Sequence, residues 1–449
     1  MMEHVSLPKG VCSLCVTVGL ERFAYYGLQS VLALYLAEML SDGRDPTSIW
    51  LLEGLSRLTG AEGVALASVV VGLFVSLASI APVIGALLAD RLLGQHRAVT
   101  AGGLLMTSGH GLLILDAALL PALGAIALGS GLFKGPVAAR LSGLYHARDS
   151  ERVEGFRLFY IAINLGGLLA PLVIGTAGER IDWHAGFAIA CAAMMAGLLV
   201  YWSHFVEATV AEPQMERTPE PSTLPAGSGT LTIGILGISV AMICVTNFQI
   251  ANAYLLWADT GFVLSLGQWR FPASWMIAAD GVLSLLALGA TRIYWARHEL
   301  RHGRTPPATK AVIGAVFAVA GVACIVLAAG LQGRNEVPIY WGLAFQLLNS
   351  LGLANILPAV MAMFGQSSAR RFAATAMAGF YLSLFAGSLV STALASQFST
   401  VSILVFWSTH ALCAVIGASG LVIVWNRTKA DATPSLRSDR GESSNSMPR

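Results

Sequence analysis

Four ionisable side chains lie deep within long apolar stretches of the sequence: Glu21, Arg22, Lys134 and Asp280. Placing such a group in the middle of a membrane helix costs at least about 2.5–3.5 kcal/mol, so these groups usually face a water-filled cavity or one another. Glu21, Arg22 and Lys134 could form a buried ion cluster that pins two helices, or they could bind a charged substrate or a proton. For Asp280, helix packing and a position in a cavity are both open.

Polar side chains follow one face of the first apolar stretch. Arg22, Tyr25 and Gln29 are three and four residues apart, which brings them to the same face of a helix, and Tyr26 flanks that face. We expect Arg22 and Lys134 to hold an anionic group of a substrate, because a guanidinium suits bidentate contact with a carboxylate. The tyrosines and Gln29 would line the rest of the site, and simple aromatic packing is the alternative for the two tyrosines.

Three amides in other apolar stretches could complete such a site: Asn164, Gln249 and Asn349. A buried amide in a membrane needs a hydrogen-bonding partner or a wet cavity. A contact between helices is the commoner explanation for an amide in this setting, and a place in the wall of a binding site is the alternative.

The composition restricts the class of protein. Of 449 residues, 55% are hydrophobic and 12% are charged, and the mean hydropathy is +0.69. Soluble domains carry roughly 25% charged residues, so an ordinary soluble enzyme and a disordered protein are both excluded. The net charge of +2 gives no indication of nucleic-acid binding. Cys12 and Cys15 have the spacing of a metal-binding pair but no second pair accompanies them, and we expect no metal, no cofactor and no enzymatic chemistry.

The apolar stretches predict an all-α membrane protein. A bilayer core takes about 20 apolar residues per helix, and twelve such stretches can be drawn. They are 11–38, 63–89, 98–119, 121–141, 154–176, 184–205, 230–258, 271–296, 309–331, 338–364, 372–397 and 400–425.

The polar segments divide these helices into two sets of six. Residues 206–229 are rich in Pro, Glu, Thr and Ser, which predicts a cytoplasmic linker between bundles at 1–205 and 230–425. Residues 426–449 predict a disordered cytoplasmic tail. Lys and Arg gather in the segments on the N-terminal side of the predicted membrane, so both termini are expected in the cytoplasm.

The loop after the second apolar stretch, GALLADRLLGQHR, contains Asp90, Arg91 and Arg97. An Asp at a helix end can cap a neighbouring helix and pair with a basic residue in one state only, which suits a gate on the inner side. The loop resembles the signature of the major facilitator superfamily. That resemblance implies a substrate site at mid-membrane between the two bundles.

Two further motifs resemble those of one family within this superfamily. ERFAYYG at 21–27 and FYIAINLGGLLAP at 159–171 resemble the helix 1 and helix 5 signatures of the proton-dependent oligopeptide transporters (POT family), and GSGLFKGP places Lys134 where that family has its helix 4 lysine. The resemblance implies an alternating-access transporter of a small-molecule or peptide-like substrate, embedded in the bilayer of the cell (inner) membrane.

The motifs also depart from the family pattern. Val18, Phe248 and Leu353 stand where typical members have acids, and Gln29 stands in place of an arginine. In typical members the helix 1 and helix 7 acids serve proton coupling and the helix 10 acid meets the peptide amino group. We therefore expect a mildly basic site and a carboxylate-bearing or peptide-like substrate whose amino group is blocked or absent.

Proton coupling is left with two candidate acids, Glu21 and Asp280, so weaker coupling than in typical members is expected. Two other functions are compatible with the same motifs. One is export of a peptide-derived metabolite such as a siderophore or an antibiotic, and the other is a transport-inactive receptor built on a transporter scaffold.

Overall fold

The computed structural model describes residues 10–41, 48–144, 149–203, 230–332, 336–366 and 373–432. Its first part contains the helices α1 (Val11–Ser41), α2 (Leu52–Thr59), α3 (Gly63–Leu88), α4 (Gln95–Leu112), α5 (Leu119–Gly143), α6 (Asp149–Ala170), α7 (Thr176–Arg180) and α8 (Trp183–Ser203), with short η2 (Ala89–Leu93), η3 (Asp116–Ala118) and η4 (Pro171–Gly175) turns. Its second part contains α9 (Thr230–Asn247), α10 (Ala253–Gly261), α11 (Trp275–His302), α12 (Pro307–Leu331), α13 (Ile339–Gln366), α14 (Ala373–Ala395) and α15 (Ile403–Ala432). The predicted linker at 206–229 lies outside the described residues.

Eight helical segments in the described part of the chain are long and apolar enough to cross a membrane. They contain α3, α5, α6, α8, α11, α12, α13 and α15. The other four predicted stretches coincide with α1, α4, α9 and α14. The helical prediction is therefore confirmed, whereas the number of twelve crossings stays a prediction.

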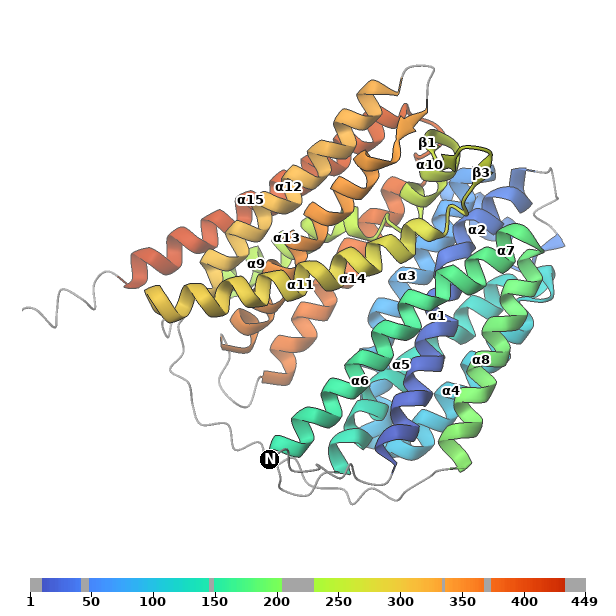
Figure 1. Cartoon of the computed structure of the whole chain (residues 1–449), viewed down its shortest axis with the longest axis horizontal. Helices are drawn as coiled ribbons and strands as arrows, with labels where there is room; N and C mark the ends of the chain where they lie inside the picture. Colours follow the sequence, from blue (N-terminus) through green and yellow to red (C-terminus); the bar gives the residue numbers. More distant parts are fainter. Residues whose placement is uncertain are drawn as a thin grey trace, which may run out of the picture.

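The helices form two bundles (Figure 1). The first contains α1 and α3–α8, and the second contains α9–α15. Small residues permit close packing of helices inside the first bundle. Such packing is expected in a membrane, because the hydrophobic effect does not drive helices together in lipid and van der Waals contact must do so instead. A Cβ atom on Gly85 of α3 would lie 2.2 Å from the carbonyl oxygen of Gly131 on α5, and one on Gly166 of α6 would lie 2.2 Å from that of Gly19 on α1.

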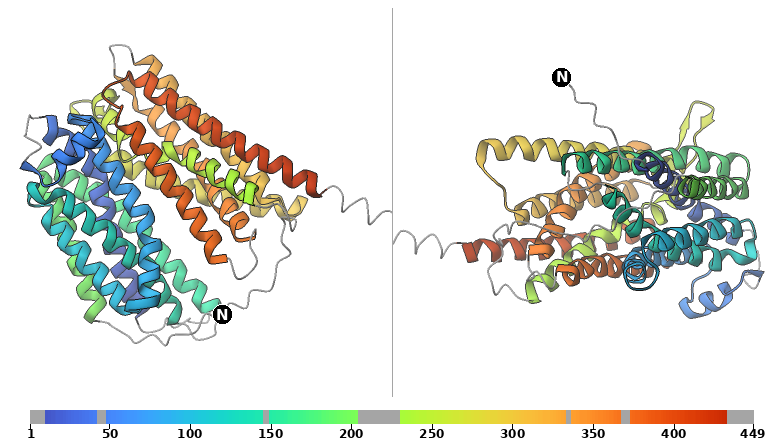
Figure 2. Two further views of the ribbon diagram at one scale, coloured as in Figure 1. Left: turned by 180° about the vertical axis from the view of Figure 1, so that it is seen from behind. Right: turned by 90° about the horizontal axis from the view of Figure 1, so that it is seen from below.

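The two bundles meet at one end and separate toward the other, as the front and rear views both show (Figures 1 and 2). We call the end near α7 and α10 the converging end, and the opposite end, where α6 begins and α11 finishes, the splayed end. Between the bundles, α3 packs against α14 and α6 against α11. The Nδ2 of Asn252 donates a hydrogen bond across the bundles to the carbonyl oxygen of Ser68 at 3.0 Å.

The predicted stretch 230–258 is broken in the middle. The helix α9 stops at Asn247 and α10 starts at Ala253. Asn252 has φ −133° and ψ −114°, outside the helical region, while its side chain bonds to Ser68. The break therefore coincides with a contact to the other bundle. A second irregularity follows α6, where Pro171, which lacks an N–H group, starts a π-type turn.

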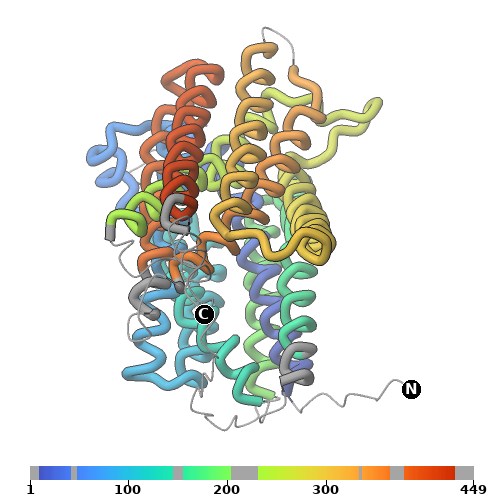
Figure 3. The backbone as a smooth tube through the Cα atoms, turned by 90° about the vertical axis from the view of Figure 1, so that its left-hand side faces the viewer, coloured from blue at the N-terminus to red at the C-terminus, as the bar shows by residue number. Residues whose placement is uncertain are grey.

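Four features of the fold were not expected from the sequence. The short helix α2 lies between the first two long helices, and the strands β2 (Ser265–Leu266) and β3 (Trp269–Arg270) form an antiparallel hairpin that projects from the converging end (Figure 3). Two further strands, β1 (Phe262–Val263) and β4 (Val337–Pro338), pair in parallel. The last helix continues to Ala432, so the tail predicted to be disordered from residue 426 begins as helix. Residues 433–449 are outside the described part.

Candidate functional site

A cavity of about 490 Å³ lies between the two bundles. The first bundle contributes residues from α1, α3, α5 and α6, and the second contributes residues from α9, from the break after α9 and from α11. Six residues that the sequence singled out line it: Tyr25, Tyr26, Gln29, Lys134, Asn164 and Asp280. Residues that are far apart in the sequence, between positions 25 and 280, thus line the same cavity.

The first bundle presents a lysine and a pair of tyrosines to the cavity. The Nζ of Lys134 lies 4.4 Å from the centre of the Tyr25 ring, within the range of a cation–π contact. Tyr25 and Tyr26 meet edge to face at 5.6 Å, and the Nε2 of Gln29 donates to the Tyr25 hydroxyl at 3.4 Å. No carboxylate of the described residues forms an ion pair with Lys134, so its charge is available to an anionic ligand.

Arg22 occupies a different place from the one expected. Its Nε lies 2.9 Å from Oε2 of Glu21, both side chains are buried, and neither lines the cavity. The two groups are close but are not oriented for a hydrogen bond. The Cζ of Arg22 is 5.9 Å and 6.0 Å from the centres of the Tyr25 and Tyr26 rings. Arg22 therefore packs beside the two tyrosines and outside the cavity wall, whereas Lys134 lines it. Joint binding of a substrate anion by Arg22 and Lys134 stays a prediction.

Asp280 brings a carboxylate to the same cavity from α11 of the second bundle. Its Oδ1 is buried and has no hydrogen-bond partner among the described residues. The sequence left packing and cavity positions open for Asp280, and the structure places it at the cavity. The cavity wall consequently contains an acidic as well as a basic side chain, whereas the sequence led us to expect a mildly basic site.

Gln249 and Asn349 are not in the cavity wall. The Nε2 of Gln249 donates to the carbonyl oxygen of Ser391 at 2.8 Å, and the Nδ2 of Asn349 donates to Oδ1 of Asn247 at 3.0 Å. Both amides therefore make contacts between segments far apart in the sequence, which is the commoner of the two explanations that the sequence left open. Asn247 itself lines the cavity together with Ser284, and the sequence analysis missed both. Asn247 was detectable as a further amide in the apolar stretch that contains Gln249.

The predicted gate lies outside the cavity. Asp90 and Arg91 are exposed on η2, and Arg97 is exposed in the first turns of α4. Among the described residues none of the three side chains forms a hydrogen bond or an ion pair. The carboxylate is therefore free to change partners, as a gate requires, and the gating role stays a prediction.

Comparison with solved structures identifies the class of fold. The chain resembles a crystal structure of a peptide transporter POT in complex with sulfate, with a TM-score of 0.79 and 23% identity, covering 94% of this chain and 95% of that one. It also resembles a POT family transporter in complex with 5-aminolevulinic acid, with a TM-score of 0.76, 18% identity and coverage of 94% and 96%. The chain has the fold of these transporters.

Sequence comparison finds similarity to the POT family over part of the chain. The family model described as PTR2, POT family, matches residues 96–208. A di-/tripeptide transporter of Lactococcus lactis subsp. cremoris is 35% identical over 207 residues, which cover 44% of this chain and 39% of the relative. The uncharacterized transporter YclF of Bacillus subtilis is 25% identical, with coverage of 91% and 92%. Together these findings show that the chain is similar to POT family transporters, and that it spans about two fifths of the length of the Lactococcus relative it matches.

Proposed function

We propose that this protein is a secondary transporter that carries a small peptide-like, carboxylate-bearing compound across the cell membrane by alternating access. The observation that carries the proposal is the cavity between the bundles, with Lys134 on one wall and Asp280 on the other. Relatives described as di-/tripeptide and peptide transporters support the substrate class.

We further propose twelve membrane crossings with both termini in the cytoplasm. Four further helices would bring the eight long apolar segments to twelve crossings, and each of the four packs along one of the eight. These contacts are α1 along α6, α4 along α5, α9 along α15 and α14 along α3. A helix enclosed in this way shares the depth of its neighbour in the bilayer. The basic residues expected in cytoplasmic segments would place the splayed end inside, so that the cavity opens inward in this structure.

In this proposal Lys134 binds the carboxylate of the substrate, while Tyr25, Tyr26, Gln29 and Asn164 complete the wall of the first bundle. Asp280 faces the other end of the substrate. Its unpaired carboxylate suits an ammonium group, so we favour a zwitterionic compound over the amino-blocked class that the sequence favoured. Asp280 is also the stronger of the two proton-coupling candidates, because Glu21 is already paired with Arg22 and lies outside the cavity wall.

Uptake of radiolabelled dialanine into proteoliposomes tests the proposal. We expect saturable uptake that unlabelled dialanine competes away and that Lys134→Gln reduces at least tenfold. Lys310→Gln is the matched control, because Lys310 pairs with Glu299 at 2.7 Å and lies outside this cavity. Efflux from loaded vesicles without uptake would favour the exporter, and binding without flux in either direction would favour the receptor.

A further inference from the structure

One carboxylate joins the two bundles at the converging end. Glu179, in the last turn of α7, accepts a hydrogen bond at Oε2 from the backbone N–H of Ala273 at 2.7 Å and at Oε1 from that of Ser274 at 2.8 Å. Ala273 and Ser274 form the turn that starts α11 in the other bundle, and Ser274 makes no side-chain cap of its own. Both oxygens of Glu179 are thus used to hold the beginning of α11.

Two further contacts lie beside Glu179, between the segment of η4 and α7 and the beginning of α11. The indole Nε1 of Trp275 donates to the Thr176 hydroxyl across the bundles at 2.9 Å. A Cβ atom on Gly175 would lie 2.2 Å from the Ser274 hydroxyl oxygen, so the backbone of η4 approaches α11 as closely as glycine permits. The contact around Glu179 is therefore a compact closure between the bundles, and the groups of α11 that bond to Glu179 in it are backbone N–H groups.

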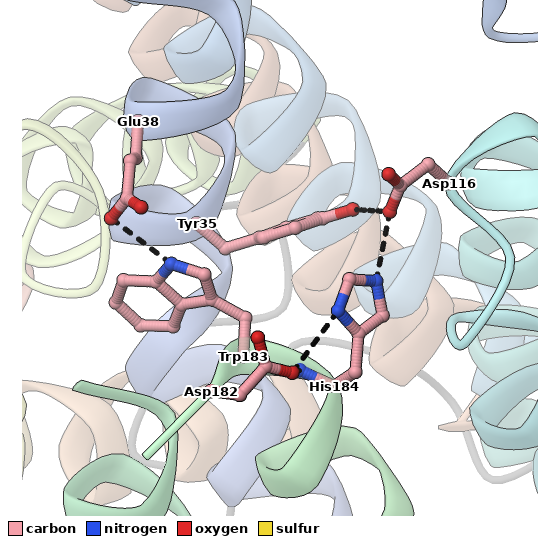
Figure 4. Close-up of polar contacts among 6 residues, drawn as sticks. All are labelled: Tyr35, Glu38, Asp116, Asp182, Trp183 and His184. Carbon is pink, nitrogen blue, oxygen red and sulfur yellow. Dashed lines mark hydrogen bonds and ion pairs between the residues drawn. The ribbon is translucent and has the colours of Figure 1, made fainter. Parts of the chain in front are cut away.

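Water can reach Glu179 from a second cavity. This cavity, of about 590 Å³, lies at the converging end and is lined by Glu179 together with Glu38, Asp259 and Arg270. Glu38 accepts a hydrogen bond from the Trp183 indole at 3.0 Å (Figure 4).

The charged groups around Glu179 leave it without a cation of its own. Arg270 pairs with Asp259 at 2.8 Å, and Arg180 donates to the carbonyl oxygen of Arg270. No ion pair to Glu179 is recorded in the described part of the chain. Glu38 and Asp259 instead bring like charge to the same cavity, so the contacts that hold the Glu179 carboxylate come from the beginning of α11.

We propose that Glu179 is a proton-operated latch: its carboxylate keeps the converging end closed, and a proton taken from that side releases α11 and lets the end open. The chemistry is direct, because hydrogen bonds to an ionised acceptor are about twice as strong as those to a neutral one. Protonation removes the negative charge of Glu179 and turns one of its oxygens into an O–H group, which is a weaker acceptor for the N–H group that it faces. The latch provides an acid-driven step that needs neither Glu21 nor Asp280, and it rests on the alternating access proposed above.

Spin-label distances across the converging end test the latch in the full-length protein in liposomes. Labels at Ile181 and Tyr340, which are 78% and 60% exposed on different bundles, would be introduced after replacement of the six native cysteines by alanine. We expect the wild-type background to shift toward long distances as the pH falls. Glu179→Gln, which mimics the protonated state, should populate the long distance at least fivefold more than wild type at pH 7.5 and should no longer respond to pH.

Two control variants separate the charge from the contact. Glu179→Asp keeps the charge and should keep a pH response. Thr176→Val removes the neighbouring hydrogen bond to Trp275 without removing a titratable group, so it should favour the open form and still respond to pH. A pH response in folded Glu179→Gln equal to that of wild type would overturn the latch.

The outcomes also separate the latch from the transport proposal. Dialanine uptake by wild type together with unchanged distances in Glu179→Gln would contradict the latch alone. A pH-dependent distance change that Glu179→Gln abolishes, in a protein that moves no substrate, would contradict the proposed transport and leave the latch in place.

Discussion

Lys134 and Asp280 line one cavity from opposite bundles, and neither side chain is paired with an opposite charge among the described residues. The lysine comes from α5 and the aspartate from α11. A molecule that bridges them would satisfy both charges and join the bundles at the same time. Such a ligand interacts differently with the two states of the transporter, which is the condition for a ligand to shift a conformational equilibrium.

Replacing Lys134 by Gln should weaken substrate binding about 10- to 100-fold. A hydrogen bond to a charged group is worth about 1.5–3 kcal/mol, and each 1.4 kcal/mol corresponds to about a factor of ten in Kd. Isothermal titration of the purified variant with dialanine measures the change. Unaltered affinity in Lys134→Gln would show that the anion of the substrate binds elsewhere.

The buried pair of Glu21 and Arg22 should behave as a structural unit. Removing one partner leaves the other charge buried and unpaired, which costs about 3–5 kcal/mol. We therefore expect Glu21→Gln and Arg22→Gln each to lower the Tm more than the double variant does. Thermal unfolding in detergent provides the comparison. Additive losses in the double variant would contradict the coupling between the two side chains.

Close helix packing at Gly166 should be sensitive to a single methyl group. A Cβ there would approach the Gly19 carbonyl oxygen to 2.2 Å, so Gly166→Ala must separate α6 from α1 and should destabilise the protein by about 1–3 kcal/mol. Gly289→Ala is the matched control, because no atom lies within 4 Å of the added carbon. Its expected effect is neutral or slightly stabilising, since Ala favours helix over Gly. Equal Tm values for the two variants would disprove the packing argument.

A gating role for Asp90 predicts an effect on the rate of transport and none on substrate affinity. Asp90 is exposed on η2, remote from the cavity wall, so Asp90→Asn should reduce the rate of dialanine uptake several-fold without a change in binding affinity. Initial rates in proteoliposomes and titration of the same preparation separate the two quantities. A weakened affinity with a normal maximal rate would assign Asp90 to binding instead of gating.

The helices were predictable because a membrane span needs a long, continuous apolar stretch, and that signal is local. The helix α2 was missed because its 8 residues are too few for such a stretch. The break between Asn247 and Ala253 contains no Gly or Pro, and it coincides with the contact of Asn252 with Ser68 in the other bundle. Local sequence therefore contains no clear signal for it.

Part of the candidate site was predictable, namely those residues whose chemical type leaves few possible positions in a membrane protein. Lys134 and Asp280 are too costly to bury in lipid, so a cavity was among the few places open to them. The role of an amide is settled by its partners, and the partner of Gln249 is the backbone of Ser391, 142 residues away. For Arg22 the sequence left a buried ion cluster and a substrate site open, and its position beside Glu21 and outside the cavity wall is set by the packing of the helices.

In the proposed site, Lys134 and Asp280 bind the two ends of one substrate. The most direct test compares the uptake of dialanine and of N-acetyl-dialanine by wild type and by Asp280→Asn in the same proteoliposomes. The account predicts that wild type prefers dialanine and that Asp280→Asn loses this preference at least tenfold, while uptake of the acetylated compound is unchanged. An equal loss for both compounds, or an undiminished preference for dialanine in the variant, would contradict it.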